Sequence, residues 1–133
     1  MIKQIIGTLD KKIAIKYGIP EYANKKIVLY PNDRRHCEKR HLQDFPDSKN
    51  FYYVLSRLDL IIDSPDIVFY NKKNSSLEYY KNIGNNISVR VRVEPGNELR
   101  VKTFFPVNET KVKEKEAKVK FLESYDQYVV GEE

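Results

Sequence analysis

The sequence predicts an α+β fold in which N-terminal helices pack on one face of a four-stranded antiparallel sheet. Helical patterns occupy the first half of the 133-residue chain, and four short strand-like segments follow one another in the second half. Links as short as those between the four segments require antiparallel neighbours, and helices followed by such a meander cover one face of the sheet. We expect one domain over residues 1–108 and a charged helix or tail over residues 109–133.

The first elements are short. Residues 1–24 alternate weakly between apolar and polar side chains, which leaves open a short strand or a helical turn, and residues 27–30 form a predicted strand. A helix is expected over about residues 33–44, with Asn32 or Asp33 capping its free backbone N–H groups. A proline shortly after residue 44 ends it.

The clearest helix covers about residues 49–62, where apolar residues recur at steps of three and four and one face can be buried. Turn-forming residues then separate four strands, at about residues 66–70, 76–83, 87–94 and 98–105. The highly charged residues 109–126 predict a C-terminal helix that docks weakly or extends outward.

Alternate side chains of a strand face opposite sides of the sheet. In residues 87–94 the valines point inward, and Arg90 and Arg92 therefore point outward. In residues 98–105 the same alternation turns Lys102 outward.

Two polar residues then fall on the inward, apolar face. Thr103 shares the inward parity of Phe105, and Lys81 shares a face with the apolar residues of its own strand. A lysine there must reach solvent or meet an anion, because burying an unpaired ammonium is costly. Threonine is common in strands, so both residues also have a purely structural interpretation. Their shared face beside a histidine-containing helix favours a functional one.

Composition limits the function classes. The net charge is +5, and the basic character resides in residues 1–108, because residues 109–133 have five lysines and seven acidic residues. This favours an anionic partner. The single Cys37 excludes an intrachain disulfide and fits a reduced, cytoplasmic setting, although a secreted toxin without disulfides would read the same way. No apolar run is long enough for a membrane span.

Residues 34–41, Arg-Arg-His-Cys-Glu-Lys-Arg-His, place both histidines on the first long helix. His36 and His41 are five residues apart and point roughly 140° from each other around the helix, so they cannot bind one metal ion from the same face. His41 shares its face with Cys37 and should lie at the boundary between helix and sheet. Either histidine alone could be structural, and His36 could be a plain surface residue.

These motifs, taken in order, resemble the phage-associated Barnase–EndoU–Colicin–RelE-like (PBECR) nucleases over about residues 5–107. The resemblance is carried by Ile6-Gly7, the helix with its His-x-x-x-x-His spacing, Ile61-Ile62-Asp63-Ser64-Pro65-Asp66-Ile67-Val68, Glu78-Tyr79-Tyr80-Lys81 and Val101-Lys102-Thr103-Phe104-Phe105-Pro106. It implies a metal-independent endoribonuclease of phage or mobile-element origin. It also implies site residues at His41, Lys81 and Thr103, with His36 in the place of the first histidine.

The mechanism implied is attack of the RNA 2′-hydroxyl on the adjacent phosphate, with no cofactor and no metal. His41 would act as general base or acid, and His36 or another nearby group as its counterpart. Lys81, with Arg34 or Arg40, would stabilise phosphate charge, and Thr103 would hydrogen-bond a phosphate oxygen. The expected substrate-binding residues are Arg34, Arg40, Arg90, Arg92 and Lys102. RNA is the expected partner, and an inhibitor or immunity protein is a further one.

Two alternatives remain open at this point. The first is a non-catalytic nucleic-acid-binding module that stacks bases on Tyr79, Tyr80 and Phe104. The second is a phage structural or partner-binding protein whose tail helix makes the contact. Cleavage of RNA in EDTA separates both from a nuclease.

Overall fold

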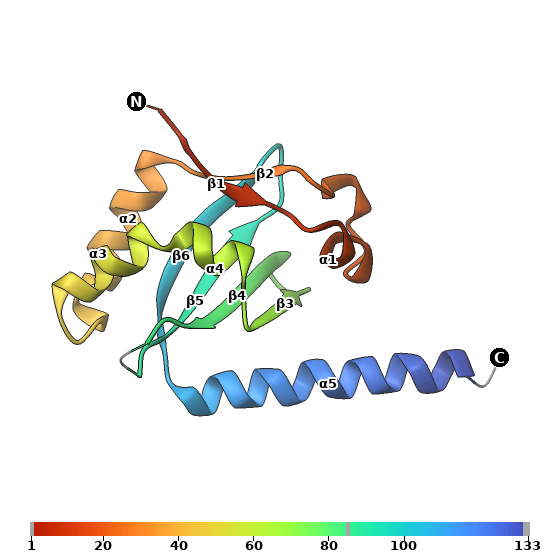
Figure 1. The fold of residues 1–133 in the computed structure, drawn as a ribbon. Coiled ribbons are helices and arrows are strands. Elements are labelled where there is room, and N and C mark those ends of the chain that lie inside the picture. Colours follow the sequence, from red (N-terminus) through yellow and green to blue (C-terminus); the bar gives the residue numbers. More distant parts are fainter. Residues whose placement is uncertain (1, 85, 132–133) are drawn as a thin grey trace.

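A computed structural model, which describes residues 2–84 and 86–131, shows a six-stranded sheet with helices around it (Figure 1). The strand order is β1-β2-β6-β5-β4-β3. In chain order the strands are β1 Gln4–Thr8, β2 Lys26–Leu29, β3 Ile67–Asn71, β4 Ser76–Asn82, β5 Ser88–Glu94 and β6 Leu99–Val107. The predicted α+β class is confirmed, but the prediction of four strands is too low.

The predicted antiparallel meander is present as β3-β4-β5-β6. The two additional strands come from the N-terminal region: β1 pairs antiparallel with β2, and β2 pairs parallel with β6 through Ile27↔Leu99 and Val28↔Arg100. A parallel pair that joins residues so distant in the chain leaves no local turn signal, and for this reason the sequence pattern did not attach these strands to the sheet.

The helices also differ in detail from expectation. Their bounds are α1 Lys11–Lys16, η1 Pro20–Tyr22, α2 Pro31–His41, η2 Leu42–Asp44, α3 Ser48–Ser56, α4 Leu58–Asp63 and α5 Glu109–Gly131. Residues 1–24 thus contain both a strand and a helix, and the expected helix over 49–62 is broken at Arg57, whose φ of −117° and ψ of 15° are not helical.

Neither residue expected to cap α2 does so. Pro31 is the first helical residue, and Tyr30 precedes it without a side-chain cap. Proline suits this position because its missing N–H has no partner in the first turn of a helix. Asp33 lies in the first turn instead, where its carboxylate meets two cations of β6.

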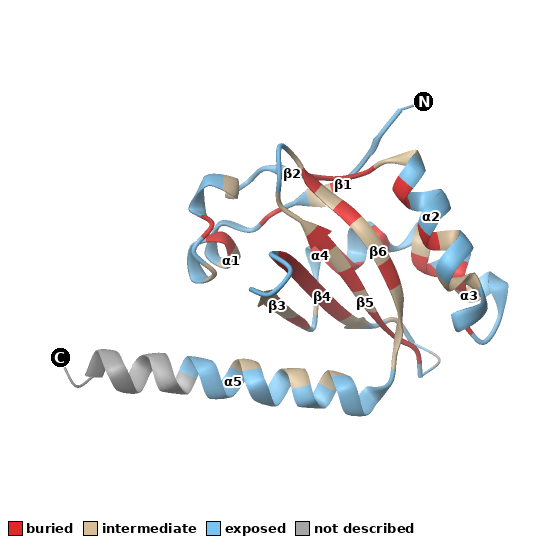
Figure 2. Ribbon diagram, turned by 180° about the vertical axis from the view of Figure 1, so that it is seen from behind, coloured by how far each residue is buried: buried red, intermediate tan, exposed pale blue. Residues whose placement is uncertain are grey.

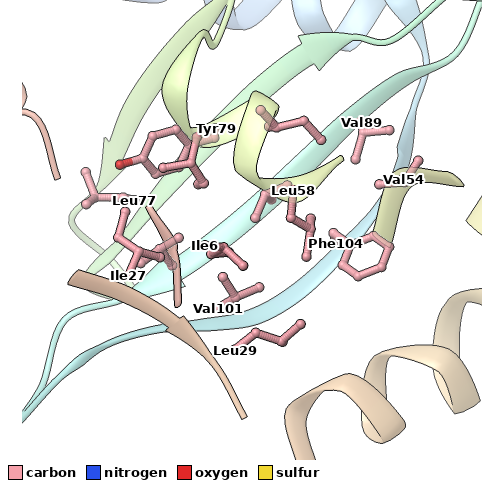
Figure 3. Packing of buried hydrophobic residues seen from close by; sticks show 14 of the residues in the cluster. Ile6, Ile27, Leu29, Val54, Leu58, Leu77, Tyr79, Val89, Val101 and Phe104 are labelled. Carbon is pink, nitrogen blue, oxygen red and sulfur yellow. The ribbon is translucent and has the colours of Figure 1, made fainter. Parts of the chain in front are cut away.

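The hydrophobic core lies between the sheet and helices α3 and α4 (Figures 1 and 3). The valines of β5 are fully buried in it, as the alternation predicts, and the outward Arg90 and Arg92 are partly exposed. The prediction that helices cover one face is therefore correct for α3 and α4. Helix α2 lies beside β6, and α5 runs beside β3 (Figure 2).

A bulge in β6 overturns the predicted parity of its second half. The register passes from Val93↔Val101 to Arg92↔Thr103. One step along β5 therefore corresponds to two steps along β6, and Lys102 is the additional residue. Such a bulge reverses the faces beyond it. Phe104 is consequently buried in the core at 0% exposure, whereas Thr103 and Phe105 lie on the outward face opposite Arg92 and Arg90. The prediction that Thr103 and Phe105 point inward is wrong.

The C-terminal helix is present as predicted, and Asn108 caps it by accepting a hydrogen bond from the Lys111 backbone N–H at 2.8 Å. It docks against β3, where the ammonium groups of Lys115 and Lys118 lie 4.2 and 5.0 Å from the centroid of the Phe69 ring. Residues 132–133 of the expected tail lie outside the described residues, as does Asn85. None of the helices in the described part of the chain is long and apolar enough to cross a membrane.

Candidate active site

Helix α2 is fixed against the edge of β6 by a buried cysteine. Strand β2 pairs with β6 only at Leu99 and Arg100, so the edge of β6 beyond them faces α2. Cys37 Sγ accepts a hydrogen bond from the Phe104 backbone N–H at 3.3 Å and donates one to the Phe104 carbonyl oxygen at 3.2 Å. Burial raises the pKa of the Cys37 thiol, which keeps it protonated and able to donate.

A second attachment holds the beginning of α2. The buried Asp33 carboxylate accepts hydrogen bonds from Arg100 at 2.7 and 3.2 Å, and Lys102 Nζ lies 3.1 Å from its other oxygen. Lys102, expected to bind substrate, is thus already paired with a carboxylate. Together with the Cys37 contact, this ion pair sets the position of the whole helix relative to β6.

His41, the last residue of α2, lies on the outward face of the sheet. Its ring stacks on Phe105, with 5.0 Å between centroids and 24° between planes. Its Nδ1 lies 2.7 Å from Asp44 Oδ2, and 21% of its side chain is exposed. Among the residues whose side chains the structure describes, 2–84 and 86–123, Nε2 has no hydrogen-bond partner. The helix–sheet seam predicted for His41 is therefore its observed place, and its free nitrogen is available to a ligand.

Arg90 contacts the same phenylalanine. It is the direct cross-strand neighbour of Phe105, and its guanidinium carbon lies 4.4 Å from the centroid of that ring. Other cations of this face have carboxylate partners: Arg92 pairs with Glu94 at 2.6 Å, and Lys115 lies 3.7 Å from Glu78.

Arg90 has no carboxylate partner among the described residues, and its Nε is buried without a hydrogen-bond partner there. A guanidinium that has no carboxylate partner among the described residues is suited to bind an anion. Its other neighbour is Tyr80, directly opposite on β4. Burial raises the pKa of Tyr80 to about 12, an effect that nearby Arg90 opposes and Glu78 reinforces, so the phenol stays neutral at physiological pH.

Thr103 completes the group. It precedes Phe105 by two residues and lies on the same face, roughly 7 Å away along the strand. Its hydroxyl lies 3.7 Å from Cys37 Sγ, and Thr103 as a whole is partly exposed. Figure 2 shows that no helix crosses this face over β5 and β6. We call the side chains of His41, Arg90, Thr103 and Phe105 the seam cluster.

Lys81 is not part of the seam cluster. It pairs with buried Val89, which places it on the inward face, as its parity predicts. Its ammonium donates a hydrogen bond to the Ser64 carbonyl oxygen at 2.5 Å and lies 3.8 Å from Asp66. The prediction that Lys81 and Thr103 share one face is wrong, because the β6 bulge turns Thr103 to the other side.

The remaining predicted residues lie around the seam cluster. His36, Arg34 and Arg40 are exposed on α2, and Arg34 lines a hollow between β1 and the start of α2 that also includes Tyr30 and Glu38. The sequence predicts Arg90 and Arg92 as outward-facing substrate-binding residues, on the other side of the sheet from the residues expected to be catalytic. Because the site lies on the outward face, Arg90 instead lies within it.

Two further observations bear on the alternative functions and on metals. Tyr79, Tyr80 and Phe104, expected to stack bases in a binding module, are 1%, 2% and 0% exposed, so none presents a ring face to a base. In the described part of the chain no three His, Cys, Asp or Glu side chains gather as a set of metal ligands.

Sequence reasoning missed Asp44 and Phe105, which contact His41 in the candidate site. The His-x-x-Asp spacing from 41 to 44 was a usable signal, because residues three apart are neighbours on a helical turn. Phe105 gave no such signal, since only the bulge moves it to the outward face.

Comparison with known proteins adds one finding. Residues 3–114, more than half of the chain, match the model of a family described as phage-Barnase-EndoU-ColicinE5/D-RelE like nuclease3. The matched segment contains all six strands, α1 to α4 and the start of α5. Searches of the curated proteins and of the solved structures give no match.

Proposed function

The chain belongs to the phage-Barnase-EndoU-ColicinE5/D-RelE like nuclease family, and on this premise we propose that it is a metal-independent endoribonuclease with its active site at the seam cluster. The observation that carries the proposal is that His41 and Arg90 both contact the side chain of Phe105. An imidazole with a free nitrogen and a guanidinium without a carboxylate contact the same phenylalanine ring. Such a pair supplies a proton-transfer group and a positive charge around one side chain of the outward face.

The proposed reaction is an internal transfer at phosphorus. A base removes the 2′-hydroxyl proton, the 2′-oxygen attacks the adjacent phosphorus, and the bond from phosphorus to the 5′-oxygen breaks. The leaving oxygen takes a proton, which gives a 2′,3′-cyclic phosphate and a 5′-hydroxyl. His41 carries out one of the two proton transfers through Nε2, since histidine exchanges protons near neutral pH.

The phosphate is held by Arg90 and Thr103 in this proposal. The guanidinium offers its terminal N–H groups to the non-bridging oxygens as negative charge develops, and the Thr103 hydroxyl donates to one of them. Lys81 is left out, because its ammonium binds a backbone carbonyl on the other face. Arg34, Arg40 and Arg92 supply the diffuse positive charge that draws RNA to this face.

The second proton transfer needs another group, and His36 is the candidate from the sequence. His36 lies on a different face of α2 from His41, so it acts only on RNA that wraps around the helix. His36→Ala therefore distinguishes two versions of the proposal. A rate loss equal to that of His41→Ala assigns the counterpart to His36, and a smaller loss assigns it to another group at the phosphate.

The test is cleavage of end-labelled RNA in EDTA by the purified protein. We expect products with 2′,3′-cyclic phosphate ends, and no cleavage of the same oligonucleotide carrying a single 2′-deoxy substitution at the cut site. Cleavage at that 2′-deoxy position would contradict attack by the 2′-hydroxyl. RNA binding without products would instead favour a non-catalytic binding module, and activity that appears only with added divalent metal would contradict metal independence.

A further inference from the structure

We infer that Asp44 is a positioning residue that fixes His41 in its Nδ1–H tautomer and aims Nε2 at the substrate. This inference deepens the proposed function and rests on it. It is carried by the Nδ1 to Oδ2 distance of 2.7 Å, by the ring contact of His41 with Phe105, and by the free Nε2.

The turn that presents Asp44 is itself held in place. Helix α2 ends at His41, and the short helix η2 follows it directly. In η2, Gln43 Nε2 donates a hydrogen bond to the Arg40 carbonyl oxygen at 3.0 Å. Phe45, directly after Asp44, is buried at 5% exposure and contacts the rings of Phe51 and Phe104. Because the next residue is locked into the core, the Asp44 backbone has little freedom to move away from His41.

The chemistry of the contact sets the tautomer. A carboxylate only accepts hydrogen bonds, so the imidazole nitrogen that faces it must carry the proton. The proton on a neutral histidine ring is placed by the hydrogen bond that one nitrogen makes. With Nδ1 protonated toward Asp44, the lone pair of Nε2 is free to accept a proton from the substrate. Stacking on Phe105 prevents the ring from turning away.

A purely structural interpretation is an ion pair that stabilises the end of α2, since residues three apart on a helix commonly pair. The two interpretations differ in what they predict for the ring. If the pair is only structural, removing the Asp44 carboxylate lowers the stability of the protein and leaves the activity of each folded molecule unchanged. If Asp44 positions the ring, removing it changes the tautomer of His41 and the rate of cleavage.

The experiment compares wild-type protein with Asp44→Ala and the isosteric Asp44→Asn, and uses Asp47→Asn as matched control. The substitution Asp47→Asn removes the same charge three residues away. Asp47 caps α3 by accepting a hydrogen bond from the Lys49 backbone N–H at 2.9 Å, and asparagine can fill the same capping role. Two quantities are measured: the 15N chemical shifts of the His41 ring at a pH where it is neutral, and the rate of RNA cleavage.

We expect the wild-type and Asp47→Asn proteins to show an unprotonated Nε2, and Asp44→Ala to move toward an Nε2–H tautomer. The cleavage rate of Asp44→Ala should fall by about 10²-fold, within the range for general acid–base groups, and that of Asp47→Asn less than threefold. An unchanged tautomer in Asp44→Ala and Asp44→Asn overturns the inference, as does an unchanged rate. Failure of the wild-type protein to cleave RNA overturns the proposed function, whereas the ring shifts still decide whether Asp44 sets the tautomer.

Discussion

Arg90→Ala is the perturbation that most sharply separates catalysis from stability at the seam cluster. The folding cost is small, because Arg90 has no carboxylate partner in the described residues and its removal strands no buried anion. What is lost is the cation–π contact with Phe105 at 4.4 Å, about 1 kcal/mol, together with the interaction of Arg90 with the Tyr80 hydroxyl. Arg92→Ala, next but one on the same strand, loses a partly exposed ion pair with Glu94, also worth up to about 1 kcal/mol, and the hydrogen bond that Arg92 Nε donates to Ser76 Oγ at 3.3 Å.

The effects on rate should differ widely. If Arg90 stabilises the charge that develops on the phosphate, its loss lowers kcat/KM about 10²- to 10³-fold, equivalent to about 2.7–4 kcal/mol. Arg92→Ala should lower it only severalfold, because the proposal gives Arg92 only the role of attracting RNA to this face. Arg90→Lys keeps the charge without the planar fork and should recover part of the loss.

The assay is cleavage of labelled RNA in EDTA under single-turnover conditions, with thermal unfolding of each variant as the stability measure. The reasoning is refuted if Arg90→Ala and Arg92→Ala reduce the rate by the same factor. It is also refuted if Arg90→Ala reduces activity only in proportion to the fraction unfolded. Either result would place the phosphate elsewhere on the protein.

Three further predictions concern the fold. Phe104→Ala should cost about 3–5 kcal/mol of unfolding free energy in urea titration, and Phe105→Ala much less while reducing cleavage; the reverse order would contradict the bulge in β6. Gly7→Ala should cost about 1–3 kcal/mol in the same titration, because a Cβ there would lie 2.9 Å from Ile62 Cγ2; an unchanged midpoint would contradict this packing. The raised pKa of Tyr80 favours the neutral phenol in the folded state. Its contribution to the free energy of unfolding is therefore fully present below pH 10 and is lost as the pH rises toward 12. Alkaline titration of Tyr80→Phe should show a shallower loss, and an identical curve would count against this burial.

The sequence predicted much of the fold because its signals are local. The alternation of valine and arginine in β5 and the short turns before and after it require only neighbouring residues, and both are present in the structure. The parallel pairing of β2 with β6 is a long-range contact without a local pattern. The break at Arg57 was equally hidden, since the apolar spacing continues unchanged from α3 into α4.

The site was predicted in part for the same reason. Helical spacing was enough to place His41 at the seam with β6, where it stacks on Phe105. Strand parity failed at Thr103, because one additional residue in β6 exchanges the faces of everything beyond it. That exchange separates Thr103 from Lys81 and brings Arg90 into the site. Alternation read from sequence assumes an unbroken strand, and a bulge of a single residue removes that assumption.

The central claim is that His41 on the outward face of the sheet is the proton-transfer group of a metal-independent ribonuclease. It is tested most directly by the single-turnover rate of RNA cleavage in EDTA for wild-type protein and His41→Ala, with thermal unfolding as the control for folding. The account predicts clear cleavage by wild-type protein and a loss of about 10²- to 10⁴-fold in a folded His41→Ala variant. A folded His41→Ala variant that cleaves RNA at the wild-type rate would contradict it.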